Sequence, residues 1–402
     1  MKIQSTFSLF ALVLLLNACS VEKMTSPVAT DKPAESITPP PAKQSSAASP
    51  ENPILKANEW SALTGWADDD IRPAWDAFLH SCIVLIKQPL WEETCSAAIS
   101  VKKLDNATLR HFFETYFVPH QVLNADESDE GLVTGYYEPL LQGSRQPSKR
   151  YRYPLHTAPD GLLIIDLGEI YPELKVTRGR LEGRKIIPYY TRAEIRNNPE
   201  ILRSHEFLWV EDKVELFFLQ IQGSGRVVLE NGEILKIGYA EHNGHPYSSI
   251  GKLLVERGEL LLEKASMQGI KQWGQENPDK LDDLLHQNSR YIFFRELSPD
   301  LSGPVGSLGV PLTAGRSIAI DPRAVPQGAP VFLATTWPNT DKQLQRLMVA
   351  QDTGSAIKGN VRVDFFWGFG LEAANQAGKM KQKGKIWVLM PNGHTQSIVA
   401  QQ

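Results

Sequence analysis

The chain has 402 residues, enough for two domains with separate hydrophobic cores, and 42% of its residues are hydrophobic. Its formal net charge of -4 gives no basic excess, so the composition does not point to a nucleic-acid partner.

The N-terminus has the pattern of an export signal. Lys2 precedes an apolar stretch, residues 7–16, which is too short to span a bilayer but fits the core of a signal peptide. The next residues, Leu16-Asn17-Ala18-Cys19, resemble a bacterial lipoprotein processing site, at which Cys19 is lipidated after removal of residues 1–18. The alternative is an ordinary cleaved signal with an incidental cysteine. Ser20, in place of an Asp, resembles the signal for sorting to the outer membrane, facing the periplasm.

Residues 19–53 are predicted to form a tether. They are poor in aromatic residues and rich in Pro, Ser, Ala and Thr, with three consecutive prolines at Pro39–Pro41. Such a segment cannot bury a core, so we expect a disordered and partly extended linker between a lipid anchor and the folded part.

Residues 58–117 are predicted to be helical. The segments AWDAFLHSCIVLIK and LRHFFETYF both have apolar residues at helical spacing. Cys82 and Cys95 flank the turn-like Gln88-Pro89 between them. They are either two separate buried thiols or a disulfide between two helices, and export to an oxidising compartment favours the disulfide.

From Val133 onward, short apolar runs broken by Gly and Pro predict strands. Thr191 and Glu194 form a capping box before a short helix. The run VVLENGEILKI predicts a β-hairpin with a type I′ turn at Asn231-Gly232, and FFLQIQG is interpreted as a strand. Helices are expected again within residues 248–273 and 281–288, and residues 291–389 are typical of a compact barrel.

Three aspartates follow short apolar runs near the C-terminus, although Asp is a poor strand former. They are Asp321 in RSIAIDPRAVPQGAPV, Asp352 in MVAQDTGSAIKG and Asp364 in RVDFFWGFG. Turn capping explains Asp321 best. It explains Asp364 poorly, because this residue continues into Phe365-Phe366-Trp367 without a turn signal. The pattern predicts acids gathered at one rim of a barrel for acid/base chemistry.

Other catalytic patterns are not found. The sequence has no GxSxG or HExxH motif. His242 and His245 lie three residues apart, but no acid or cysteine cluster completes a metal site, so neither a metal nor a cofactor is expected.

The segments that contain the three aspartates resemble the C-terminal domain of the membrane-bound lytic murein transglycosylase A family. GYYEP at Gly135–Pro139, FFLQIQGSGRV at Phe217–Val227, GYAEHNGHPYSSIGKLL at Gly238–Leu254 and NSRYIFFREL at Asn288–Leu297 agree with the same family. The resemblance implies a mainly β fold with flanking helices. A double-psi β-barrel, residues 54–140 and 239–402, would carry an inserted all-β domain, residues 141–238, with a groove between the two for a glycan strand.

The resemblance also implies an activity. A lytic exotransglycosylase, a carbon–oxygen lyase, cleaves the β-1,4 bond between N-acetylmuramic acid and N-acetylglucosamine in peptidoglycan and leaves a 1,6-anhydro ring, in cell-wall turnover and recycling. The sugar's own C6 hydroxyl is the nucleophile, so one carboxyl can serve first as acid and then as base. Asp364 matches the family's catalytic residue, and Asp352 would support it. In a regular strand Arg362 would share the face of Asp364 and lower the pKa of Asp364, so we expect Arg362 to be turned aside or paired elsewhere.

Substrate contacts are expected from polar and aromatic side chains in the matching segments: Tyr136, Tyr137, Glu138, Gln220, Gln222, Ser224, Tyr239, Asn243 and Asp321. Gln220 and Gln222 would share one face of the predicted strand, where they could equally form an exposed polar surface. Two alternatives remain open: an inverting glycan hydrolase, in which Asp352 activates water, and a non-catalytic peptidoglycan-binding lipoprotein. The expected partners are glycan strands and, through the lipid, the outer membrane; a partner in cell-wall synthesis or division machinery is left open.

Overall fold

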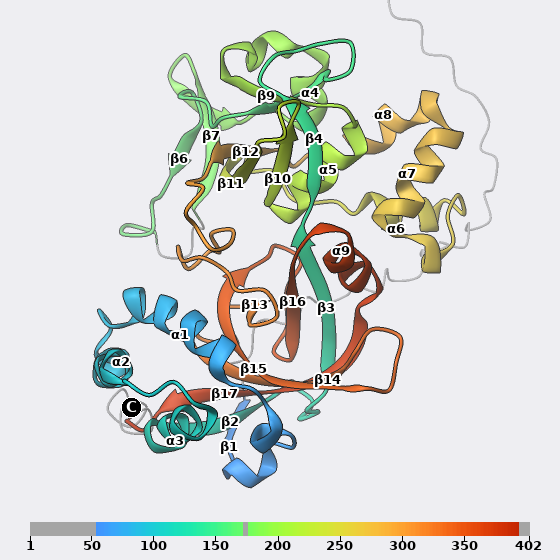
Figure 1. Ribbon diagram of the computed structural model, residues 1–402. Helices are drawn as coiled ribbons and strands as arrows, with labels where there is room; N and C mark the ends of the chain where they lie inside the picture. Colours follow the sequence, from blue (N-terminus) through green and yellow to red (C-terminus); the bar gives the residue numbers. More distant parts are fainter. Residues whose placement is uncertain (1–53, 172–175, 394–402) are drawn as a thin grey trace, which may run out of the picture. The chain divides into compact units, whose positions relative to one another are not determined.

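The computed structural model describes residues 54–171 and 176–393 (Figure 1). The signal peptide, Cys19 and the tether lie outside these residues. Within them, no helix is both long enough and apolar enough to cross a membrane.

The larger sheet has eight strands, and six of them close into a barrel. The order is β1-β2-β17-β14-β15-β13-β16-β3, and a further pairing between β17 and β3 closes the ring. The bounds are β1 Ile54–Ala57, β2 Phe117–Leu123, β3 Gly131–Glu138, β13 Ser317–Ile320, β14 Pro330–Thr336, β15 Gln343–Thr353, β16 Arg362–Phe369 and β17 Lys381–Pro391. Closure removes the free edges of the ring, and β1 and β2 extend the sheet beyond it.

Three helices precede the barrel strands: α1 Arg72–Leu85, α2 Pro89–Ser100 and α3 Asn106–Tyr116. Local signals set their starts, since α1 and α2 have a proline in the first turn and the Asp105 side chain caps α3 by accepting from Thr108 N at 2.8 Å. Their apolar faces share one core with the barrel, in which Trp75, Phe78 and Phe113 are fully buried. The prediction of helices within residues 58–117 is confirmed.

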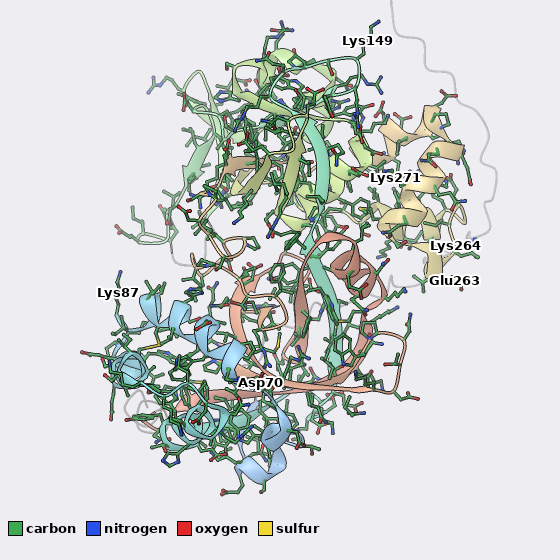
Figure 2. The ribbon with its side chains drawn as sticks, viewed as in Figure 1. Asp70, Lys87, Lys149, Glu263, Lys264 and Lys271 are labelled. Carbon is green, nitrogen blue, oxygen red and sulfur yellow. A yellow bond between two sulfur atoms is a disulfide. The ribbon has the colours of Figure 1, made fainter. Side chains whose placement is uncertain are left out.

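A disulfide joins Cys82 of α1 to Cys95 of α2, with the Cα atoms 5.3 Å apart; Figure 2 draws such bonds in yellow. We expect a Cys82→Ala/Cys95→Ala variant to lose about 3 kcal/mol of stability, because the bond restricts a short loop in the unfolded chain. Urea denaturation with and without reductant measures this. The reductant should lower the midpoint of the wild type and leave that of the variant unchanged; equal midpoints for oxidised and reduced wild type would contradict the prediction.

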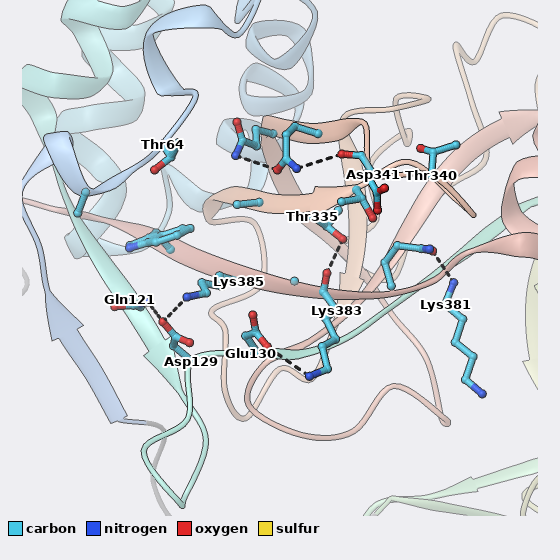
Figure 3. A pocket seen from close by; sticks show the side chains of 18 of the residues that line it. Thr64, Gln121, Asp129, Glu130, Thr335, Thr340, Asp341, Lys381, Lys383 and Lys385 are labelled. Carbon is cyan, nitrogen blue, oxygen red and sulfur yellow. Dashed lines mark hydrogen bonds and ion pairs between the residues drawn. The ribbon is translucent and has the colours of Figure 1, made fainter.

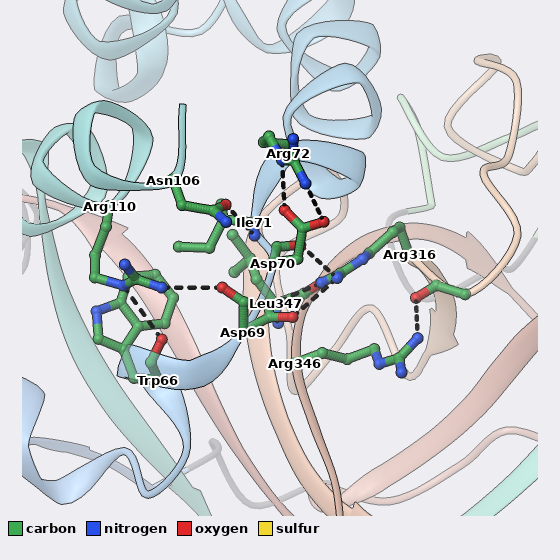
Figure 4. A network of polar contacts seen from close by, with 11 residues as sticks. Trp66, Asp69, Asp70, Ile71, Arg72, Asn106, Arg110, Arg316, Arg346 and Leu347 are labelled. Atoms are coloured by element: carbon green, nitrogen blue, oxygen red, sulfur yellow. Dashed lines mark hydrogen bonds and ion pairs between the residues drawn. The ribbon is translucent and has the colours of Figure 1, made fainter. Parts of the chain in front are cut away.

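A buried ion pair ties the segment before α1 to the barrel (Figure 4). Both terminal guanidinium nitrogens of Arg316 donate to the Asp69 carboxylate, at 2.8 and 2.9 Å, and Asp69 also accepts from Leu347 N at 2.7 Å. The Arg316 and Asp69 side chains are 7% and 5% exposed, so the pair is shielded from water. Arg316 directly precedes β13, the strand on which the candidate site depends.

The middle of the chain forms two further sheets. The order of the six-stranded sheet is β12-β11-β10-β4-β9-β5, and that of the three-stranded sheet is β6-β7-β8. The bounds are β4 Leu140–Ser144, β5 Tyr153–His156, β6 Leu163–Ile165, β7 Thr177–Glu182, β8 Lys185–Pro188, β9 Glu206–Val210, β10 Ser224–Leu229, β11 Ile234–His242 and β12 Ile292–Glu296. The segment 141–238 therefore differs from the expected domain: β11 continues past its end, and β12 joins the same sheet from residue 292.

The remaining helices are α4 Arg192–Asn197, α5 Lys213–Gln222, α6 Ile250–Glu256, α7 Met267–Glu276, α8 Pro278–His286 and α9 Gly370–Lys379. The capping box of Thr191 and Glu194 at the start of α4 is confirmed. An all-β segment is predicted at residues 141–238. The structure differs, because α4 and α5 lie within this segment.

The prediction of a strand at FFLQIQG is wrong, because these residues form the end of α5. The Asp212 side chain caps the helix by accepting from Val214 N at 2.8 Å, and Gly223 ends it in the left-handed conformation with φ 80°. These caps at the two ends of the helix outweigh the alternating pattern of the sequence between them.

The β10–β11 hairpin is confirmed, but its turn is not type I′. Leu229 N donates to Glu233 O at 2.8 Å and Gly232 N donates to Leu229 O at 2.9 Å, so the loop has three residues. Gly232 has φ 85°, whereas Asn231 is not among the residues with positive φ that type I′ requires at both central positions.

Candidate active site

Strand β13 brings two of the three aspartates together. It pairs with β15 on one side, where Ala319 is opposite Asp352, and with β16 on the other, where Ala319 is opposite Asp364. Paired residues point to the same face of a sheet, so both acids share the face of Ala319. Their backbones are two strand spacings apart, roughly 10 Å.

An extra residue in β15 gives Asp352 this orientation. The β13–β15 register runs from Ser317↔Val349 to Ala319↔Asp352, so two steps along β13 match three along β15. Without the extra residue Ala319 would be opposite Gln351, and Asp352 would point to the other face of the sheet. This β-bulge therefore places a carboxylate beside Asp364.

Asp352 is held by three hydrogen-bond donors. One carboxylate oxygen accepts from Ser307 N and from Thr353 N, both at 2.9 Å, and the other accepts from Tyr136 Oη at 3.0 Å. Burial raises the pKa of Asp352, while these donors act in the opposite direction. Its oxygens are thus engaged as acceptors within the protein.

Asp364 has a different environment. Its Oδ1 accepts from Thr134 Oγ1 at 2.5 Å, on the parallel neighbour β3, and the structure shows no donor to Oδ2 among the described residues. Burial raises the pKa of Asp364 to about 6; the Thr134 hydrogen bond and the Arg362 charge lower it, and Asp352 raises it further. A carboxyl with this pKa can hold a proton at mildly acidic pH and release it near neutrality.

Arg362 forms no ion pair with Asp364 among the described residues, as expected. Its Nη2 donates to Thr134 Oγ1 at 2.9 Å, and its Nη1 donates to Leu132 O and Val363 O. Arg362 therefore reaches Asp364 through Thr134.

Only one of the three aromatic residues after Asp364 shares its face. Alternation along β16 places Phe366 there, where the Tyr136 ring lies 5.1 Å away between centroids. Phe365 and Trp367 point to the opposite face and contact each other, with centroids 4.6 Å apart. Of the three, Phe366 is therefore the one placed to exclude water from the face of Asp364.

Asp321 does not join the other two acids. It is buried and accepts from Arg323 Nε and Nη2, at 2.9 and 2.5 Å, and from Gly359 N at 3.0 Å. The Arg323 hydrogen bond holds the pKa of Asp321 well below its ordinary value. These contacts agree with turn capping, the interpretation preferred from the sequence.

The other residues expected to bind substrate fall into two groups. The first group lies on β3 or contacts it. Tyr136 of β3 donates to Asp352, and Gln222 Oε1 accepts from Tyr137 N of β3 at 3.3 Å. Glu138 is buried and pairs with Arg226 at 3.1 Å. Ser224 is half-buried at the start of β10.

The residues of the second group form hydrogen bonds with other residues in or near the six-stranded sheet. Gln220 is 4% exposed and accepts from Arg192 at 2.5 Å, and Asn243 is 1% exposed and donates to Tyr190 O and Ser289 O. Tyr239 is exposed and donates to Glu241 at 2.8 Å. The structure does not bring Gln220 or Asn243 to the two acids.

Three residues of the site were not predicted: Thr134, Ser307 and Ala319. Thr134 directly precedes the segment GYYEP, and Ala319 lies within the apolar run before Asp321. Their roles depend on pairing with distant strands, which no local pattern indicates. Across residues 54–171 and 176–393, no three His, Cys, Asp or Glu side chains are grouped so that they could hold a metal ion.

The fold and the site define a class: a mainly β protein with a closed barrel that presents two unequal carboxyl groups on one face. Two family models match the chain, the MltA specific insert domain over residues 132–295 and the 3D domain over residues 316–390. A curated relative, membrane-bound lytic murein transglycosylase A of Vibrio cholerae, is 31% identical over 322 residues, which cover 78% of each chain. The chain belongs to the membrane-bound lytic murein transglycosylase A family.

Solved structures agree with this assignment. The crystal structure of MltA from Neisseria gonorrhoeae is 40% identical, covers 85% of this chain and 93% of its own, and has a TM-score of 0.76. The structure of E. coli MltA with bound chitohexaose is 26% identical, covers 84% of this chain and 91% of its own, and has a TM-score of 0.60.

Proposed function

We propose that the protein is a lytic transglycosylase that cleaves the β-1,4 bond between N-acetylmuramic acid and N-acetylglucosamine in peptidoglycan, with Asp364 as its acid and base. The observation that carries this assignment is the unequal environment of the two acids. Asp352 has three donors, whereas Asp364 has one, a raised pKa of about 6 and an oxygen without a donor among the described residues. The family membership and the chitohexaose bound to the E. coli relative support a glycan substrate.

The reaction needs one proton carrier. The protonated Asp364 carboxyl donates its proton to the glycosidic oxygen as the bond to C1 breaks. The resulting carboxylate then accepts the proton of the C6 hydroxyl as this oxygen attacks C1 and closes the 1,6-anhydro ring. The nucleophile is part of the same sugar, so proximity replaces an activated water. Asp352 accepts a hydrogen bond from Tyr136, which orients this ring, and it raises the pKa of Asp364.

The end group of the product tests this function. Digestion of purified peptidoglycan followed by mass spectrometry of the fragments should give 1,6-anhydro ends. Reducing ends in their place would support an inverting hydrolase, in which a second carboxylate activates a water. No fragments at all would support a non-catalytic binding protein.

A change at Thr134 should move the pH dependence. Thr134→Val removes the hydroxyl that lowers the pKa of Asp364, so this pKa should rise. Activity requires the protonated acid, which is lost as pH rises through about 6 in the wild type. The pH at which kcat/KM declines should therefore increase by about one unit in Thr134→Val. The exposed Thr115→Val on α3 is the control, and an unchanged profile in Thr134→Val would contradict the assigned acid.

We also propose that Cys19 carries a lipid that anchors the protein in the outer membrane. The support is the sequence Leu16–Cys19 after a short apolar core, together with the membrane-bound relatives. Cys19→Ala should lack the acyl modification and leave the outer-membrane fraction, as judged by mass analysis and fractionation. An unmodified cysteine in the mature wild-type protein would contradict the anchor.

The proposed transglycosylase activity includes exolytic cleavage, which starts from the ends of glycan chains.

A further inference from the structure

A hollow lies among strands and loops of the barrel, and Figure 3 shows side chains that line it. Its volume is about 960 Å³, and it is framed by β2, β14, β15 and β17. Asp352, Asp364 and Tyr136 do not line it. The two sites are nevertheless neighbours, since Lys381 at the rim of the hollow is opposite Thr134 across the β17–β3 pairing, and Thr134 donates to Asp364.

Amide and hydroxyl side chains dominate the lining of the hollow. They include Gln121, Gln343, Gln345, Asn339, Thr64 and Thr336. Such groups can both donate and accept hydrogen bonds, as a peptide or an oligosaccharide requires. Among the described residues that line the hollow, Trp387 is the one aromatic residue, and it is only 6% exposed. A sugar ring would find no aromatic face on which to pack, so the lining suits a peptide better than a glycan.

The charges at the hollow are only partly neutralised. Lys383 pairs with Glu130 at 3.5 Å, and Lys385 pairs with Asp129 at 2.9 Å. Lys381 and Asp341 are exposed, and the structure shows no ion pair for either of them among the described residues. Figure 3 places Asp341 and Lys381 on different edges, after β14 and at the start of β17. The hollow thus offers one cation and one anion at separate points.

We infer that this hollow is a non-catalytic binding site for the peptide stems of peptidoglycan, short peptides that carry free carboxylates and an amine. Lys381 binds a carboxylate of the peptide, Asp341 binds its ammonium group, and the amide side chains bind its backbone. The identity of the polymer rests on the proposed function. A stem held here keeps its polymer close to Asp364, which raises the effective concentration of glycan at the catalytic carboxyl.

The test measures peptide binding separately from catalysis. Isothermal titration calorimetry uses an isolated stem tetrapeptide with a free amine, and chitohexaose as the peptide-free probe. The variant is Lys381→Gln/Asp341→Asn, and the matched control is Lys102→Gln/Asp160→Asn, two exposed residues that do not line the hollow. We expect the tetrapeptide to bind the double variant about tenfold more weakly than the wild type, because two charge contacts are lost. The control variant should bind the tetrapeptide like the wild type, and all three proteins should bind chitohexaose equally.

On intact peptidoglycan the double variant should have a higher KM and an unchanged kcat. Equal tetrapeptide affinity in the double variant and the wild type, or no binding to the wild type, would overturn the site. Weaker binding of chitohexaose by the double variant would overturn its assignment to peptide. These binding results do not depend on the reaction. Tetrapeptide binding without anhydro products would contradict the proposed function and leave the peptide site supported.

Discussion

Asp364→Asn should release almost no anhydro fragments from peptidoglycan. Asparagine keeps the size and shape of the side chain but cannot donate and retake a proton. Loss of a general acid or base costs roughly 10²–10⁴-fold, and both steps of this reaction use the same carboxyl, so we expect the upper end of this range. The rate of fragment release at saturating substrate is the measurement, and activity near that of the wild type would remove Asp364 from the mechanism.

The Asp364→Asn variant should lose activity while remaining folded. The ordinary pKa of Asp364 is 3.8 and its pKa in the folded protein is about 6. The contribution of this group to stability is therefore complete below 3.8 and is lost as pH rises through 6, because ionisation is disfavoured in the folded state. Asn cannot ionise, so Asp364→Asn should be at least as stable as the wild type at neutral pH. Asp352→Asn is the matched comparison and should be less severe for activity.

Asp69→Ala should strongly destabilise the folded protein. It leaves the guanidinium of the buried Arg316 without its carboxylate, and it removes the acceptor of Leu347 N. Breaking a buried ion pair by removing one partner costs about 3–5 kcal/mol, because an uncompensated charge stays buried. Urea denaturation should show a large fall in the midpoint.

The adjacent residue supplies a control for this prediction. Asp70 accepts two hydrogen bonds from Arg72, at 2.7 and 2.8 Å, in a solvent-exposed pair. Water replaces such contacts, so Asp70→Ala should change the midpoint little. Similar midpoints for Asp69→Ala and Asp70→Ala would show that the Arg316 pair does not stabilise the barrel.

Local signals predicted much of the secondary structure. The helical spacing before Phe117, the capping box at Thr191 and the β10–β11 hairpin are all present, because each depends on residues close together in sequence. The alternating pattern of Phe217–Gly223 fits a strand as well as a helix, and the caps at Asp212 and Gly223 decide for the helix. The three-residue turn at Gly232 shows the same limit: turn type depends on backbone geometry as well as on residue identity.

The candidate site was only half predictable. Asp352 and Asp364 stood out because acids at strand ends are unusual, and family resemblance distinguished their roles. Thr134 lies 230 residues before Asp364, and its hydrogen bond exists only because β3 and β16 are neighbours in the closed barrel. The bulge that turns Asp352 toward Asp364 is likewise a property of strand register, which the residues around Asp352 do not reveal.

Digestion of peptidoglycan in water labelled with heavy oxygen tests the central claim most directly. If Asp364 acts alone and the C6 hydroxyl is the nucleophile, the wild-type fragments carry 1,6-anhydro ends without label at C1, and Asp364→Asn releases almost none of them. Heavy oxygen at C1 of the wild-type fragments, lost in Asp352→Asn and kept in Asp364→Asn, would show that an activated water attacks and would contradict the single-carboxyl mechanism.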